Sequence, residues 1–315
     1  MNKKQKIFLT SIALLITVIM GIAISYNGNI NTEKVNIVVT FYPLAYLSQQ
    51  IGGDLVQVTQ LVPNNTEIHS WEPSASSIIA AENADIIIYN GADLDHWIEH
   101  DILPALSSNK LRVIVDSTDN LQLLSATETE IAEDHHAHSE YDPHTWVSPY
   151  MAKLQAEKIF NALVQVDPEH QNYYTERWEK IENELTDLDE NYQSVLSTAQ
   201  KTGIFVSHEA FGYLAHRYGF EQYGVIGLSG DEQPSATTIA SLIDKMVLHE
   251  TYVVYVDPVH SDQYIQAIKS EVQKQTDQNV TVLELYLMLG PTDNMNLIEQ
   301  MEMNLNNLRI GLEAT

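Results

Sequence analysis

The sequence contains no cysteine. Disulfides, thiolate metal sites and a cysteine nucleophile are therefore excluded, and any bound metal ion must rest on histidine and carboxylate groups. Basic residues are also scarce, because 16 Lys and Arg stand against 43 Asp and Glu, which gives a formal net charge of −27. Nucleic-acid binding needs clustered Lys and Arg, so this balance argues against it and favours either solubility or the attraction of cations.

Hydrophobic residues make up 44% of the 315 residues. This fraction excludes a globally disordered chain, and the length is enough for two ordinary domains or one large one.

The first six residues include three lysines, and an uncharged apolar run follows from residue 7 to about residue 24. A basic start followed by such a run predicts a signal peptide or an uncleaved membrane anchor over residues 1–26. No cysteine follows the run, so a bacterial lipoprotein anchor is excluded. The lysines would stay in the cytoplasm, which places the rest of the chain outside it.

Beyond this segment, short runs rich in β-branched residues alternate with helical stretches. The predicted strands are residues 35–40, 56–62, 85–90, 112–116, 203–207, 252–257 and 280–285, and the predicted helices include residues 43–51, 74–82 and 237–249. The continuous apolar run Ile86-Ile87-Ile88 is typical of a strand buried on both faces, as in a parallel sheet covered by helices. The pattern predicts an α/β protein with two Rossmann-like lobes, each with a central, mostly parallel sheet.

A long helix is predicted between the two halves. Asp167 and Pro168 are suited to the N-cap and the first helical position, and neither Gly nor a further Pro occurs until about Gln200. Apolar residues recur at spacings of four and three, which predicts one apolar stripe on a helix about 45 Å long. We interpret the helix, residues 167–200, as a rigid connection between an N-terminal lobe, 27–166, and a C-terminal lobe, 201–315. A coiled-coil dimer is the alternative.

The segment 125–142 has a different composition. It lacks hydrophobic periodicity and combines six carboxylates with His135, His136 and His138. We predict a surface loop, which either collects metal ions weakly or is simply solvated.

Three other histidines lie in turn-like segments: His69, His144 and His208. His69 and His208 follow predicted strands, and ligands of open α/β sheets bind at the carboxyl ends of strands, so the three side chains could converge. Imidazole is the commonest metal ligand in proteins, and three ring nitrogens suit Zn²⁺. Each histidine alone could equally be a cap or a hydrogen-bonded turn residue. The HExxH signature of many zinc enzymes is absent.

The local motifs favour the metal site. "IHSWEPS", "YDPHTWVSP" and "SHEAFGYLAHRYG" resemble, in this order, the three metal-ligand motifs of the substrate-binding proteins of zinc and manganese ABC importers (cluster A-I). The resemblance extends over about residues 35–313. It implies a protein that is not an enzyme, acts outside the cytoplasm as a monomer, and delivers Zn²⁺ to a membrane ABC permease with its cytoplasmic ATPase.

The resemblance also implies that His69, His144 and His208 bind the metal. Manganese-selective relatives usually carry Glu at the position of His208, so a third imidazole favours Zn²⁺ over Mn²⁺, a harder cation. Uptake of manganese or iron is the alternative. The fourth ligand stays open between Glu284, a water molecule, and Glu67 or another carboxylate, because Ile68 cannot bind a metal.

Three further residues have predicted supporting positions. Asp142 is expected to orient a ligand histidine or a turn. Asp257 and His260 are expected at the edge of the cleft between the lobes.

Because three histidines and a water also form catalytic zinc sites, a zinc hydrolase is the rival from another class, with Glu209 as the nearest candidate base. A surface adhesin on the same fold is a third possibility.

Overall fold

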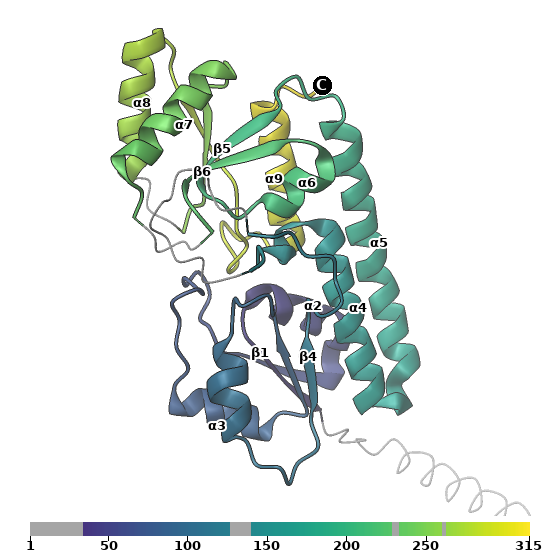
Figure 1. Cartoon of the computed structure of the whole chain (residues 1–315). Coiled ribbons are helices and arrows are strands. Elements are labelled where there is room, and N and C mark those ends of the chain that lie inside the picture. Colours follow the sequence, from purple (N-terminus) through teal and green to yellow (C-terminus); the bar gives the residue numbers. More distant parts are fainter. Residues whose placement is uncertain (1–33, 127–139, 229–232, 260–262) are drawn as a thin grey trace, which may run out of the picture. The chain divides into compact units, whose positions relative to one another are not determined.

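The computed structural model describes residues 34–126, 140–228, 233–259 and 263–315, and Val35–Thr315 form one compact unit (Figure 1). The predicted signal or anchor, residues 1–26, lies outside the described residues, as do His135, His136, His138 and His260. Among the helices of the described ranges, none is both long and apolar enough to cross a membrane.

The first sheet contains four parallel strands in the order β2-β1-β3-β4. Their bounds are β1 Val35–Val39, β2 Val56–Gln60, β3 Ile86–Tyr89 and β4 Val113–Asp116. The helices α2 (Tyr42–Gly52) and α3 (Ala75–Asn83) connect β1 to β2 and β2 to β3. All four residues of β3 are buried, which agrees with the apolar run that predicted a covered parallel sheet.

The second sheet repeats this arrangement in the order β6-β5-β7-β8, and its strands are also parallel. Its strands are β5 Gly203–His208, β6 Glu221–Ile226, β7 Val253–Val256 and β8 Thr281–Glu284, and its helices are α6 Gly212–Tyr218, α7 Ala236–Leu248 and α8 Gln263–Thr276. The predicted fold class, two α/β lobes with parallel sheets, is confirmed. We call the first sheet with its helices the first lobe, and the second sheet with its helices the second lobe.

Three long helices accompany the sheets: α4 Pro149–Val166, α5 Gln171–Leu196 and α9 Leu297–Gly311. α4 and α5 lie side by side (Figure 1). Single turns of 3₁₀ or π helix occur at Gly53–Leu55, Ile98–Ile102, Leu103–Ala105, Thr145–Val147 and Pro168–His170.

The predicted long helix is α5, and it begins later than predicted. A 3₁₀ turn at Pro168–His170 precedes it. The Asp167 carboxylate caps no backbone N–H group. It instead accepts the Tyr174 hydroxyl at 2.7 Å and contacts the His170 ring at 2.8 Å. The helix has 26 residues and is therefore about 39 Å long.

The apolar stripe of α5 is buried within this chain. Tyr174, Trp178, Ile181, Leu185, Leu188 and Tyr192 are all buried. The helix packs against α2, α4 and α9, so its stripe has partners in the described part of the same chain without a coiled-coil dimer. One buried apolar cluster joins residues of both sheets through α4, α5 and α9, and a second lies between the second sheet and α7 and α8. The first cluster is shared by the two lobes, and it therefore holds the chain segments that lie between the two sheets.

Candidate metal centre

The structure brings together His69, His144 and His208, which are far apart in sequence. His69 lies in the turn that follows β2, His144 directly precedes the 3₁₀ turn Thr145–Val147, and His208 is the last residue of β5. One ring nitrogen from each lies within 4.8 Å of the other two. His144 and His208 are 1% and 3% exposed, and His69 is half-buried.

The spacing of the imidazoles suits a tetrahedral ion. The Nε2 atoms of His69 and His144 are 3.2 Å apart. A zinc ion with Zn–N bonds of about 2.0–2.1 Å and tetrahedral angles separates two ligand nitrogens by about 3.3 Å. The His208 ring centroid is 5.0 Å from that of His144 and 6.0 Å from that of His69. The three rings thus surround one point.

Asp142 orients the His144 ring. Its Oδ1 atom accepts the backbone N–H of His144 at 2.9 Å and lies 2.8 Å from the ring Nδ1. A proton on Nδ1 leaves the lone pair on Nε2, the atom that faces His69. Burial raises the pKa of Asp142 to about 6, and the hydrogen bond from the His144 backbone opposes this rise. The carboxylate therefore fixes the ring orientation and the tautomer that offers Nε2 to a metal ion.

The other two histidines are also fixed by neighbouring groups. All six residues of β5 are buried, and the Nε2 atom of His208 lies 2.9 Å from the carbonyl oxygen of Leu228. The backbone N–H of His69 donates to Glu67 Oε1 at 3.1 Å, and the adjacent Ile68 is part of the buried core. Glu67 therefore shapes the turn that carries His69.

Glu284, one of the candidates for the fourth ligand, does not belong to this group. It is the exposed last residue of β8, and its carboxylate accepts the Tyr286 hydroxyl. In the ranges that the structure describes, the three histidines are the one group of three or more possible ligand residues close enough for a metal ion, and no carboxylate belongs to it.

Two other acidic residues of the prediction bind backbone groups. Asp257 accepts the N–H of Val259 at 2.7 Å and that of Leu287 at 2.6 Å. Glu209 follows His208, but its Oε1 accepts the N–H of Gly224 on β6 at 2.9 Å. The candidate base of a hydrolase is therefore engaged with the second sheet.

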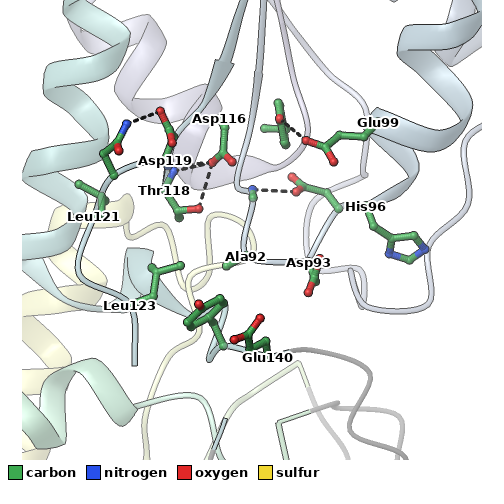
Figure 2. A pocket seen from close by; sticks show the side chains of 15 residues that line it. Ala92, Asp93, His96, Glu99, Asp116, Thr118, Asp119, Leu121, Leu123 and Glu140 are labelled. Atoms are coloured by element: carbon green, nitrogen blue, oxygen red, sulfur yellow. Dashed lines mark hydrogen bonds between the residues drawn. The ribbon is translucent and has the colours of Figure 1, made fainter. Parts of the chain in front are cut away.

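Sequence reasoning missed one contact of the His144 segment and one cavity. Trp146 joins the His144 segment to the second lobe, since its Nε1 donates to the carbonyl of Leu287 at 2.7 Å. An acidic cavity of about 560 Å³ lies at the carboxyl ends of β3 and β4. Its lining includes Asp93, Glu99 and Asp116, and Asp116 accepts the hydroxyl and N–H of Thr118 (Figure 2). Trp146, two residues after His144 in the motif, was a signal that could have indicated the contact with Leu287. The acidic residues of the cavity are too scattered in the sequence to indicate it.

Two α/β lobes with parallel sheets and a group of three convergent imidazoles define a class of metal-binding protein. The family described as "Zinc-uptake complex component A periplasmic" (ZnuA) matches residues 37–311, so the chain belongs to this family.

Individual relatives agree with this assignment. The chain is 29% identical over 288 residues to the "High-affinity zinc uptake system protein ZnuA" of Bacillus subtilis, covering 89% of this chain and 88% of that protein. It is 32% identical over 282 residues to the "Zinc-binding lipoprotein AdcA" of Streptococcus pneumoniae, covering 88% of this chain and 55% of that longer protein.

A solved structure is also similar. The Zn(II)-bound ZnuA-like domain of Streptococcus pneumoniae AdcA matches with a TM-score of 0.73 and 29% identity, over 89% of this chain and 99% of that one. The family resemblance predicted from the three motifs is confirmed. The prediction of zinc as the metal agrees with these zinc-binding relatives. The family's role is zinc uptake, which is transport and not catalysis, as predicted.

Proposed function

We propose that this chain is the extracytoplasmic component of a zinc importer and that His69, His144 and His208 hold Zn²⁺ as its cargo. The observation that supports this most is the three-imidazole group, in which the Nε2 atoms of His69 and His144 are 3.2 Å apart, as two nitrogens of a tetrahedral zinc site would be. The zinc-binding relatives support the same metal.

Three imidazoles favour Zn²⁺ over Mn²⁺. Manganese is the harder cation and prefers carboxylate, carbonyl and water oxygens, whereas zinc accepts nitrogen readily. No carboxylate among the described residues joins the histidine group. We therefore rank manganese or iron uptake below zinc uptake.

We assign the fourth position to a water molecule in place of Glu284. His69 is half-buried, so solvent reaches its side of the group, and the nearby Glu67 already accepts the backbone N–H of His69. A position held by water suits a cargo ion that must leave the protein again. A zinc hydrolase would need a base beside that water, and Glu209 is held at β6 by the N–H of Gly224.

The transport cycle requires a membrane partner. We propose that the loaded protein, as a monomer, delivers zinc to an ABC permease with its cytoplasmic ATPase. Residues 1–26 would serve as a signal peptide or an anchor that places residues 27–166, 167–200 and 201–315 outside the cytoplasm. His135, His136 and His138 would collect zinc near the site.

X-ray absorption at the zinc edge tests the assigned coordination. The zinc-loaded protein should show three imidazoles and one oxygen, at Zn–N distances of about 2.0–2.1 Å. Asp142→Glu serves as a control that changes the support of His144 without removing a ligand. Two imidazoles with two or more carboxylate oxygens would contradict the assignment.

A further inference from the structure

Asp142 is held by the second lobe as well as by its own segment. The segment containing Asp142 packs on the first sheet, since Asn90 Nδ2 donates to the Pro143 carbonyl at 2.9 Å. On its other side, the buried Tyr213 donates its hydroxyl proton to the carbonyl of Asp142 at 2.7 Å. The same hydroxyl accepts the N–H of Leu124 at 3.2 Å. One tyrosine of α6 therefore fixes both chain segments that meet at Asp142.

Gly212 allows this close approach. A Cβ atom at position 212 would lie 2.4 Å from Asp142 Oδ2, a distance that real Cβ contacts essentially never show. Any larger residue at this position would push the carboxylate away. Since Oδ1 of the same carboxylate orients the His144 ring, such a push would be transmitted to a metal ligand.

Gly212 and Tyr213 belong to the segment that supplies His208. β5 ends at His208, and α6 begins at Gly212. The N–H of Phe211, between them, donates to Gln222 Oε1 on β6 at 2.9 Å, which fixes this turn to the second sheet. The second lobe thus contributes one histidine directly, and through Tyr213 it holds the backbone of Asp142, the residue whose carboxylate orients another histidine.

We propose that Gly212 and Tyr213 are positioning residues for zinc, which keep Asp142 where it directs the Nε2 atom of His144 into the site. This inference rests on the proposed zinc function. It gives release a physical basis, because a movement that withdraws the start of α6 removes His208 and frees Asp142 and His144 in the same step. Such a movement would cost the site one ligand and the orientation of a second.

Tyr213→Phe in the full chain tests the proposal, because it removes only the hydroxyl group. Zinc affinity, measured by competition with a chelator, should weaken about tenfold, the lower end of the effect of groups that support metal ligands. The matched control is Tyr218→Phe on the same helix, whose hydroxyl donates to Asp189 Oδ1 at 2.8 Å, away from the histidines. The control should keep the wild-type affinity even where it lowers stability.

A double-mutant cycle separates positioning from general destabilisation. In an Asp142→Ala background, Tyr213→Phe should have no further effect on zinc affinity, because the group that it positions is absent. Gly212→Ala provides a second variant, which should also weaken zinc binding and also lose its effect in that background.

The outcomes are distinguishable. Wild-type affinity in Tyr213→Phe, or an equal loss in both backgrounds, would overturn the positioning role while zinc binding by the wild type stands. Failure of the wild-type chain to bind zinc would overturn the proposed function and this inference with it.

Discussion

Replacement of Arg217 by methionine should destabilise the protein through the loss of a partly buried ion pair at the end of α6. The Arg217 guanidinium forms a two-point ion pair with Asp189 on α5 and lies over the Tyr150 ring, 3.8 Å from its centroid. Asp189 is 8% exposed, and it also accepts the Tyr218 hydroxyl at 2.8 Å. This cluster therefore joins the start of α4, the middle of α5 and the end of α6.

The expected loss follows from the burial of the two partners. Removing one partner of a fully buried ion pair costs about 3–5 kcal/mol, because the other charge is left without compensation. The Arg217 side chain is 33% exposed, so solvent screens part of the interaction, and we expect about 2 kcal/mol. Unfolding entropy grows with chain length, at about 2.1 cal/mol/K per residue, so for Val35–Thr315 that loss lowers the melting temperature by about 3 °C.

Thermal unfolding of the metal-free protein measures this effect. Lys180→Met is the matched control, since Lys180 is 73% exposed and lies 3.9 Å from Glu184. Its loss should stay within about 0.5 kcal/mol. Arg217→Met combined with Asp189→Leu should regain part of the stability, because the buried charge is gone. Equal melting temperatures for Arg217→Met and Lys180→Met would refute the reasoning.

Three further predictions concern the metal. Zinc at a hundredfold excess over its dissociation constant should stabilise the fold by about 2.7 kcal/mol, and a chelator should reverse the rise in melting temperature. An unchanged melting temperature of the wild type with zinc would contradict binding to the folded state. Zinc affinity should fall as the pH drops from 7 to 5, because imidazoles must be neutral to bind a metal ion. Burial also raises the pKa of Asp142 to about 6, so its carboxylate loses its charge as the pH falls through that value. Calorimetry at both pH values checks this, and equal affinities would contradict it. Glu284→Gln should leave the zinc dissociation constant unchanged, since Glu284 lies outside the histidine group; a loss of about tenfold would restore it as a ligand.

Much of the fold could be predicted because parallel strands covered by helices carry continuous apolar runs. Ile86-Ile87-Ile88 is the clearest case, and it forms the buried β3. β6 was missed because it is an edge strand with Gly224 in its middle and mostly partial burial. The start of α5 was misplaced because Asp167 binds the His170 and Tyr174 side chains, which local N-cap preferences do not reveal.

The convergence of His69 and His208 could be expected because both lie beyond or at the carboxyl end of a strand, β2 in the first sheet and β5 in the second, and ligands of open α/β sheets bind at the carboxyl ends of strands. The direction of the Glu284 side chain could not be predicted, because a shift of one residue along a strand turns a side chain to the opposite face of the sheet. The contact of Tyr213 with Asp142 joins residues 71 positions apart and leaves no local pattern. Contacts of this kind depend on how the two lobes pack against each other.

Calorimetric titration of the metal-stripped protein with Zn²⁺ and with Mn²⁺, in the wild type and in His208→Ala, tests the three-histidine zinc site most directly. We predict one zinc ion per chain, tighter binding of zinc than of manganese, and a collapse of zinc binding in the variant. Preferential binding of manganese, or zinc binding that does not depend on His208, would contradict the site and the function built on it.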